Sequence, residues 1–300
     1  MNGMEIGEAA PVREGAGTLF LVATPIGNLE DMTFRAVEVL RGADLIAAED
    51  TRVTRGLLTH FEIRARLVSY HEHNKKQKEP ELIRLLLSGT NIALVTDAGM
   101  PGISDPGADL AAACYDEGIP VTIVPGACAA VSALAISALD TRRFVFEGFL
   151  PTNKKERRAV LERLAGETRT CVLYEAPHRL AKTLEEMARA LGDRRVTVVK
   201  ELTKRHEKRR RMTLPEAAAY YAANEARGEY VLVLEGKDPQ ELAGEAQEAW
   251  TAMSVADHVR MYEEQGLDRK EAMRRAAGDR GVSRREIYAQ LLGAEESTKQ

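Results

Sequence analysis

The sequence predicts an α/β protein with two consecutive α/β domains of unequal size, followed by a small helical module. Two observations predict the α/β part. Between Leu19 and Glu235, short apolar runs alternate with segments of helical spacing, and this alternation is typical of sheets covered by helices. Several of these runs end in turns rich in glycine and proline. A third observation separates the tail, because no apolar strand-like run follows Gly236.

The first domain is expected at residues 18–148, after a disordered leader at residues 1–17. Short apolar runs predict its strands at Leu19–Ala23, Leu45–Ala48, Ile92–Val95, Val121–Val124 and Phe144–Glu147. Apolar residues at helical spacing predict helices at 34–42, near Leu57–Phe61, at 82–87, at 108–115 and from Ala129 to Leu139. The polar run Tyr70–Lys76 is expected to be a loop.

The second domain is expected at residues 149–236, entered through a linker at Gly148–Asn153. Its strands are predicted at Thr170–Tyr174, Val196–Val199 and Glu229–Glu235. Its helices are predicted at Lys154–Leu164, after Glu175 as far as Leu191, and from Pro215, since proline suits the first turn of a helix. The basic run Lys204–Arg211 is interpreted as a loop that faces a ligand.

Residues 237–300 are predicted to form a linker rich in acidic residues and alanine, and then three short helices. Three residues of the type that caps helix N-termini precede these helices: Ser254, Asp268 and Ser283. We expect Ile287, Tyr288 and Leu291 to line the inner face of the last helix. Its start is similar to the entry of a helix-turn-helix recognition helix, and a simple packing module is the alternative.

Composition and charge exclude several classes of protein. The net charge is -4, so an anionic partner must be met by local basic patches. The three cysteines are spaced like neither a zinc site nor a disulfide framework, which indicates a reducing compartment. The N-terminal residues lack the apolar core of a signal peptide, and no apolar run has membrane-spanning length. We therefore expect a cytoplasmic protein with no membrane association.

Three turns at strand ends are the candidate binding elements: residues 24–29, 97–107 and 125–129. Such ends can frame one pocket in an open sheet. The turn at 97–107 contains three glycines and two prolines, which suits a rigid loop close to a ligand; a long turn with a helix N-cap at Ser104 or Asp105 is the alternative.

The absence of two motifs limits the ligand. There is neither a P-loop motif nor a Gly-x-Gly-x-x-Gly fingerprint. Pro25 and Pro101 also remove backbone donors that a phosphate cradle needs. An uncharged or zwitterionic ligand of the adenosyl type fits these loops better than a polyphosphate.

Two polar segments remain. His71 and His73 would point the same way on an extended segment, as zinc ligands do. No third ligand is near, so we interpret them as a polar wall or a substrate-facing loop, without a metal. The basic run at 204–211 favours contact with RNA phosphates, although such runs are usually solvated faces.

Together these motifs resemble the tetrapyrrole methylase superfamily, the class III methyltransferases that use S-adenosylmethionine, over residues 18–236. The matching segments are Ala23–Asp31, Ala48–Arg52, His71–Asn74, Asp97–Gly107, Pro125–Gly126, Glu147–Pro151, Tyr174–Arg179 and Glu201–Lys204. Within the superfamily, the resemblance is to the branch that acts on ribosomal RNA. It implies 2′-O-methylation of a cytidine ribose in the decoding (P-site) region of 16S rRNA on the 30S subunit, by a homodimer.

The resemblance also implies a site. S-adenosylmethionine would lie between the two α/β domains, on Pro25, Gly27, Gly99, Met100, Pro101, Ile103, Ser104, Cys128, Ala129 and Tyr174. RNA would be held by Arg52, Asn74, Arg179, Lys204, Arg209 and Arg211. A base is needed because the ribose hydroxyl is a weak acid, and the candidates for base or ribose positioning are Glu49, Asp50, His73 and Asp97. Alternative functions are methylation of a corrinoid precursor, and ribosome assembly by non-catalytic RNA binding.

Overall fold

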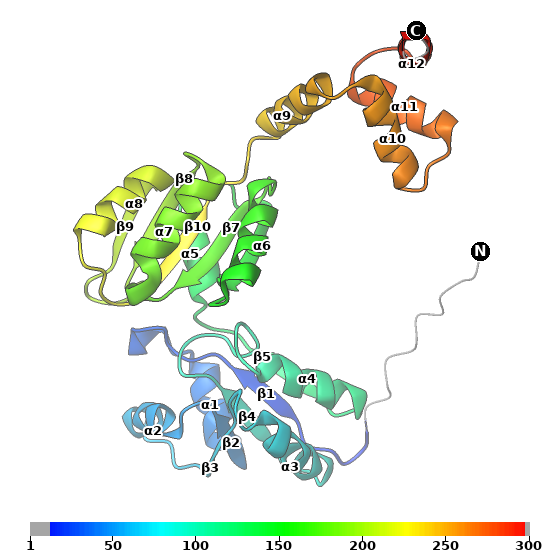
Figure 1. Ribbon diagram of the computed structural model, residues 1–300. Helices are drawn as coiled ribbons and strands as arrows, with labels where there is room; N and C mark the ends of the chain where they lie inside the picture. The colour runs from blue at the N-terminus through cyan, green and yellow to red at the C-terminus, as the bar shows by residue number, and fades with distance from the viewer. Residues whose placement is uncertain (1–12, 298–300) are drawn as a thin grey trace. The chain divides into compact units, whose positions relative to one another are not determined.

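The computed structural model describes residues 13–297, so most of the expected leader lies outside the described residues. The chain divides into two compact units. One unit contains both β-sheets and ends at Glu235. The other contains the helices that follow Gly236, together with residues 162–168 (Figure 1). No helix of the described chain is long and apolar enough to cross a bilayer.

The first sheet is parallel, with strand order β3-β2-β4-β1-β5. Its strands are β1 (Leu19–Val22), β2 (Leu45–Ala48), β3 (Leu67–Ser69), β4 (Ile92–Val95) and β5 (Val121–Val124). Helices α1 (Phe34–Gly42) and α2 (Thr51–His60) bury apolar residues against one face. Helices α3 (Lys75–Leu87) and α4 (Gly107–Asp116) cover the other. The predicted layered α/β fold is therefore confirmed, because helices cover both faces of the sheet.

The second sheet is mixed, with strand order β6-β7-β10-β8-β9. Its strands are β6 (Phe144–Phe149), β7 (Thr170–Glu175), β8 (Arg195–Lys200), β9 (Lys208–Thr213) and β10 (Tyr230–Leu234). Its flanking helices are α6 (Lys154–Ala165), α7 (Pro177–Leu191) and α8 (Leu214–Ala223). Helix α5 (Ala129–Ala135) also packs on this sheet, where Ala130, Ala133 and Leu134 share a core with four of its valines.

The structure corrects several expected elements of these sheets. Strand β3 was not predicted, and α5 ends at Ala135 instead of Leu139. The supposed linker begins within β6, which continues to Phe149 past a register irregularity between Phe146 and Gly148. Half of the basic run is not a loop, because Lys208 to Arg211 lie in β9, at the edge of the sheet.

The helical unit contains α9 (Pro239–Ala252), α10 (Val255–Glu264), α11 (Arg269–Asp279) and α12 (Arg284–Ser297). The expected linker is therefore largely helical. Ser254 and Asp268 cap their helices as predicted, and the Ser283 hydroxyl accepts from the Glu286 N–H. Ile287 and Leu291 are buried as expected, whereas Tyr288 is 55% exposed, so its assignment to the inner face was wrong.

A polar cluster lies inside the helical unit. The imidazole of His258 is fully buried, with its Nε2 atom 3.2 Å from a carboxylate oxygen of Asp279. Arg280 Nε donates to Nδ1 of the same ring at 3.0 Å. Because Nδ1 accepts this bond, the ring is neutral, and both burial and the Arg280 charge lower its pKa.

Candidate active site

The three turns at the strand ends meet at Gly99. Its backbone forms two hydrogen bonds with Thr24, of 2.9 and 3.0 Å, as an isolated antiparallel bridge. A Cβ atom at Gly99 would lie 3.2 Å from the Ile26 side chain and 3.7 Å from the Ala127 carbonyl oxygen. The residue also has φ = +91°, which favours glycine. The predicted juxtaposition of the three turns is therefore present.

A cavity of about 490 Å³ opens beside these turns, between the two sheets; we name it the Tyr174 cavity. The β4–α4 loop contributes one wall, and the start of α5 contributes Cys128 and Ala129. Strands of the second sheet contribute Tyr174, Val199 and Val231. The volume lies in the range of pockets for small molecules and cofactors. Its lining is largely apolar, which suits a flat heterocycle.

Tyr174 fixes the entry to α5. Its hydroxyl accepts the Ala130 backbone N–H at 3.1 Å, and its ring packs edge-on against Phe146 and Phe149. Burial raises the pKa of Tyr174 to about 12, so the phenol stays neutral and acts as a rigid wall of the cavity.

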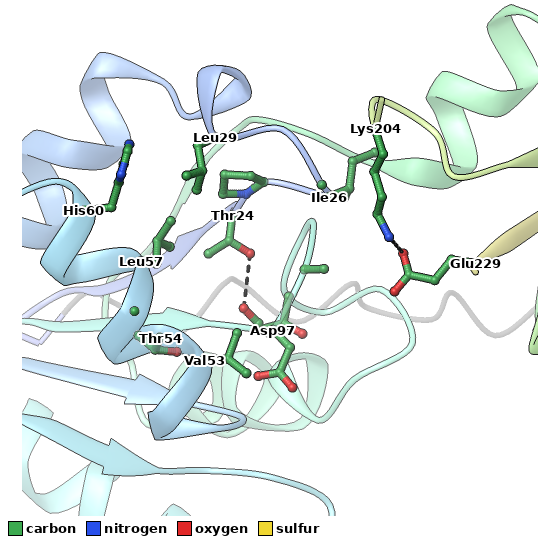
Figure 2. Close-up of a pocket in the computed structure, with 15 residues that line it drawn as sticks. Thr24, Ile26, Leu29, Val53, Thr54, Leu57, His60, Asp97, Lys204 and Glu229 are labelled. Atoms are coloured by element: carbon green, nitrogen blue, oxygen red, sulfur yellow. Dashed lines mark hydrogen bonds and ion pairs between the residues drawn. The ribbon is translucent and has the colours of Figure 1, made fainter. Parts of the chain in front are cut away.

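A second cavity, of about 390 Å³, adjoins the first; we name it the His60 cavity (Figure 2). Helix α2 supplies Val53, Leu57 and His60 to one side, and the first turn supplies Pro25, Gly27 and Leu29. Both cavities are lined by five common residues: Ile26, Thr96, Asp97, Ala98 and Glu229. Two ligands, one in each cavity, would therefore meet at Asp97.

Three carboxylates gather where β2 and β4 end. Asp97 accepts the backbone N–H of Asp50 at 2.9 Å. Glu49 accepts the Thr96 hydroxyl at 2.6 Å and lies 3.3 Å from the Asp97 N–H. Partial burial raises the pKa of Asp97 and the charges of Glu49 and Asp50 act in the same direction, while the Asp50 N–H opposes them. A carboxylate with a raised pKa at a cavity wall is suited to accept a proton.

Asp50 and His73 are placed differently from Asp97. Asp50 is the N-cap of α2 and lines neither cavity. Its bonds to the Arg52 guanidinium lower its pKa to about 2, which makes it a poor base. His73 is exposed and also lines neither cavity. No group of three or more metal-ligating side chains in residues 13–297 is placed to hold a metal ion.

Lys204 connects the two halves of the site. Its ammonium is 2.9 Å from Glu229 and 3.0 Å from Glu201, and it lines the His60 cavity. The aliphatic stem covers Gly27, where a Cβ atom would overlap it. Gly27 therefore allows the close approach of a loop from the second sheet.

The cofactor residues predicted from the sequence fall into three groups. Seven line the Tyr174 cavity: Gly99, Met100, Ile103, Ser104, Cys128, Ala129 and Tyr174. Pro25 and Gly27 line the His60 cavity, and Pro101 lines neither.

The residues predicted to bind RNA differ in their exposure and in their contacts within the protein. The Asn74 side chain accepts from the His71 N–H and donates to Ser69, so it braces its own loop. Arg179 is mostly buried, donates to the Leu150 carbonyl oxygen and lies 3.3 Å from Glu175. Arg52, Arg209 and Arg211 are exposed. The geometry thus gives Asn74 and Arg179 bracing roles within the protein.

Several lining residues were not predicted. Thr96 follows a predicted strand directly, and Phe149 falls in the segment that was interpreted as a linker. His60 and Leu57 lie on the cavity face of α2. Tyr230 begins β10, and Glu229 directly precedes it. Only Thr96 had a signal in the sequence, its position at a strand end; the others depend on how the two sheets pack.

Two five-stranded α/β layers, with a large cavity at turns between them, are the architecture of the class III methyltransferases. Residues 18–218 match the family model of the Tetrapyrrole (Corrin/Porphyrin) Methylases. The chain therefore belongs to the tetrapyrrole methylase family, and the resemblance seen in its motifs is confirmed.

Curated relatives specify the branch. The ribosomal RNA small subunit methyltransferase I of Halalkalibacterium halodurans is 49% identical over 280 residues, 92% of this chain and 95% of that protein. The protein of the same name from Bacillus subtilis is 48% identical over 272 residues, 91% of this chain and 93% of that protein.

Solved structures support the fold. Uroporphyrin III C-methyl transferase from Thermus thermophilus has a TM-score of 0.53 and 19% identity, over 73% of this chain and 97% of that one. A structure of that enzyme complexed with S-adenyl homocysteine has a TM-score of 0.52 and 19% identity over the same shares. Cobalt precorrin-4 methyltransferase has a TM-score of 0.53 and 19% identity, over 73% and 94%.

Proposed function

We propose that this protein is an S-adenosylmethionine-dependent methyltransferase of small-subunit ribosomal RNA. We further propose that it methylates the 2′-oxygen of a cytidine ribose in the decoding region of 16S rRNA. The relatives that share nearly half of its residues over nine-tenths of its length support the first statement. The single structural observation that supports transfer to a hydroxyl group is that Asp97 lines both cavities.

The Tyr174 cavity fits the methyl donor. Its volume of about 490 Å³ and apolar lining suit an adenosyl group. Gly99, Met100, Ile103, Cys128 and Ala129 would hold the donor, mostly by close approach of the backbone. When bound, S-adenosylmethionine supplies a methyl group on a positively charged sulfur. The neutral Tyr174 phenol keeps this wall rigid through its bond to Ala130.

The His60 cavity would receive the ribose. The reacting hydroxyl would then lie beside Asp97, the wall that the two cavities share. Asp97 would accept the hydroxyl proton, and its raised pKa brings its basicity closer to that of the alkoxide it must form. Glu49 would position Asp97 by accepting the Asp97 backbone N–H and the hydroxyl of the preceding Thr96 at the end of β4. Holding the two reactants in adjacent cavities also lowers the barrier, because the hydroxyl oxygen and the methyl group are already oriented toward each other.

The experiment is methyl transfer from labelled S-adenosylmethionine to small ribosomal subunits, with mass spectrometry of the RNA to locate the methyl group. Asp97→Asn keeps the shape of the side chain and removes its basicity, so kcat should fall by about 10²- to 10⁴-fold. Donor affinity should change little. Asp50→Asn is the matched control, since Asp50 is a neighbouring carboxylate that lines neither cavity.

Two outcomes would contradict the proposal. Full activity of Asp97→Asn would show that Asp97 is not the base. If the wild type transferred no methyl group to the small subunit, that subunit would not be the substrate. As the pH falls, the wild-type rate should decline when Asp97 becomes protonated, at a pH above the ordinary value for an aspartate.

We also infer a homodimer that uses the free edge of the first sheet. Strand β5 lies at that edge, and its Val121 and Ile123 side chains are exposed. Phe34, on the adjoining end of α1, is 93% exposed. Arg35 connects the two elements by donating to the Ile123 carbonyl oxygen. An exposed apolar group of this kind on an edge is typical of an interface. Analytical ultracentrifugation of the wild type and of Ile123→Lys tests this, and a monomeric wild type would refute it.

A further inference from the structure

A small notch lies on the far side of the second sheet from the Tyr174 cavity. It has a volume of about 90 Å³ and lies between β8, β9 and α8. We name it the Arg210 notch. Its polar lining residues are Lys200, Lys208, Arg210, Tyr220, Asn224 and Glu225. Lys208 and Arg210 belong to the basic run 204–211, for which the sequence favours contact with RNA phosphates; the other lining residues were not singled out.

The register of the sheet explains why the cations converge. Lys208 pairs with Lys200, and Arg210 pairs with Val198. Residues directly opposite each other in an antiparallel pair point to the same face, so all of these side chains lie on the α8 side. Val199, one residue along, lines the Tyr174 cavity, and strand residues alternate between faces. The notch and the cavity therefore lie on opposite faces of one sheet, and both are lined by Tyr230 at the start of β10.

The cations of the notch outnumber its carboxylates. Across the described residues, no carboxylate oxygen lies within 4 Å of a charged nitrogen of Lys200, Lys208 or Arg210, so none of the three has a salt bridge. The acidic residue of the notch, Glu225, is paired with Arg227 at 2.7 Å. Three positive charges and one negative charge therefore line this concave surface, although the whole chain has a net charge of -4.

Aromatic rings fix the cations in place. The Arg210 guanidinium carbon lies 4.4 Å from the centre of the Tyr220 ring. The Lys200 ammonium lies 6.0 Å from the centre of the Tyr230 ring. A cation held over an aromatic face keeps its hydrogen-bond donors free, and a held guanidinium loses less entropy when it binds an anion.

The size of the notch selects the anion. Its volume of about 90 Å³ is several times the space that one buried water molecule requires. A nucleoside needs a much larger space, whereas a single phosphate group fits. On this geometry, and resting on the proposed function, we propose that the Arg210 notch binds a backbone phosphate of the RNA substrate.

The position on β9 gives the path of the RNA. Strand β9 pairs only with β8 and forms the edge of the sheet. Arg209 pairs with Val199, on the cavity face of the sheet. An RNA strand that passes around this edge contacts the notch on one face and Arg209 on the other, on its way to the site. The notch supplies affinity without sequence readout, as phosphate contacts do.

The test measures binding of the full-length protein to small ribosomal subunits and to a decoding-region RNA at several salt concentrations. Lys208→Ala/Arg210→Ala should weaken binding about tenfold. It should also lower the slope of log K against log[salt] by about 0.7 to 1. Donor affinity and kcat at saturating RNA should be unchanged. Arg189→Ala is the matched control, because this exposed arginine of α7 is already paired with Glu185.

The outcomes separate this inference from the proposed function. If the double variant bound RNA with the affinity and salt slope of the wild type, the proposal that the notch binds a phosphate of the RNA would be refuted. Arg210→Lys keeps the charge and should keep most of the slope. Inorganic phosphate is the competing probe at matched ionic strength. If it displaced RNA from the wild type far better than chloride, and not from the double variant, RNA would occupy the notch as proposed. If phosphate bound the notch and left RNA affinity unchanged, the notch would be a free-anion site and the RNA assignment would be wrong. A wild type that binds RNA but transfers no methyl group would refute the proposed function alone.

Discussion

The substitution Gly99→Ala tests whether the meeting point of the three turns shapes the donor cavity. Two costs follow from the structure. Alanine at φ = +91° is strained by about 1–2 kcal/mol. Its Cβ would also lie 3.2 Å from Ile26, and overpacking of this kind costs about 1–3 kcal/mol. If the turns separate to relieve the contact, the second cost appears as lost donor affinity, about fivefold to about a hundredfold.

Gly102→Ala is the matched control for Gly99→Ala. Gly102 lies in the same loop with φ = +87°, but a Cβ there would meet its nearest atom at 3.7 Å, an ordinary contact. Both variants carry the backbone strain, so their difference isolates the contact with Ile26. Titration calorimetry with S-adenosylmethionine measures the affinities, and urea unfolding measures stability. If Gly99→Ala binds the donor no more weakly than Gly102→Ala, the cavity does not depend on the meeting of the turns.

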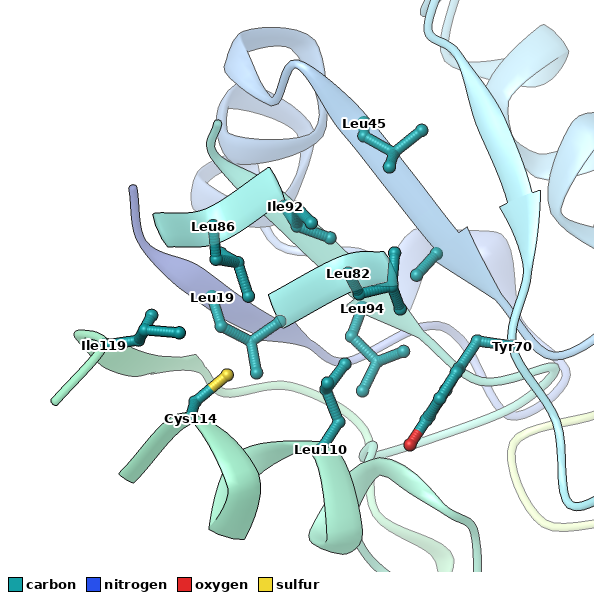
Figure 3. Close-up of a cluster of buried hydrophobic side chains, with 11 residues drawn as sticks. Leu19, Leu45, Tyr70, Leu82, Leu86, Ile92, Leu94, Leu110, Cys114 and Ile119 are labelled. Atoms are coloured by element: carbon teal, nitrogen blue, oxygen red, sulfur yellow. The ribbon is translucent and has the colours of Figure 1, made fainter. Parts of the chain in front are cut away.

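Three further predictions concern stability. Leu82→Ala removes a fully buried side chain from the core beneath α3 and α4 (Figure 3), and should lower the free energy of unfolding by about 2–5 kcal/mol in urea titrations; a loss below 1 kcal/mol would show that the core collapses around the gap. Arg179→Ala leaves Glu175, which is only 2% exposed, without its cation, and should cost about 3–5 kcal/mol in the same assay. RNA affinity of the folded Arg179→Ala protein should stay at the wild-type level, and a selective loss of RNA binding would return the residue to the RNA site. The third prediction is that the helical unit loses stability as the pH falls below 6.5. The pKa of His258 is lowered in the folded state, so the unfolded state binds a proton at a higher pH than the folded state does. Falling pH therefore favours unfolding. Fluorescence of Trp250, the only tryptophan, reports on this unfolding because its ring stacks on His258 at 5.6 Å; a transition midpoint that is the same at pH 8 and pH 5.5 would contradict it.

Most strands of the first sheet could be predicted from the sequence because each is a short, continuous apolar run. β2, β4 and β5 begin and end at the predicted residues. Strand β3 has only three residues, all half-buried, so it has no apolar run to find. Strand β9 is basic along most of its length because it is an exposed edge, and a run of arginines resembles a loop. Alanine and glutamate in the supposed linker have high helix propensity, which favours α9.

The candidate site was predictable to the extent that it is built from strand ends. Residues after β4, such as Gly99 and Ser104, were assigned to the binding loop from backbone punctuation, and they line the Tyr174 cavity. The residues that face them from the second sheet depend on packing between distant segments. Polarity alone also could not separate free cations from engaged ones, because Arg179 and Arg209 look alike in the sequence.

The placement of α5 has a consequence for synthesis on the ribosome. This helix leaves the exit tunnel before any strand of the second sheet, yet Ala130, Ala133 and Leu134 find their apolar partners only there. A nascent chain that ends near residue 149 thus carries an uncovered apolar helix. A fragment that begins near residue 150 lacks α5, the helix that covers part of the second sheet. Neither piece should fold alone. Splitting the gene between the two sheets should therefore yield two aggregation-prone polypeptides that become soluble when they are co-expressed.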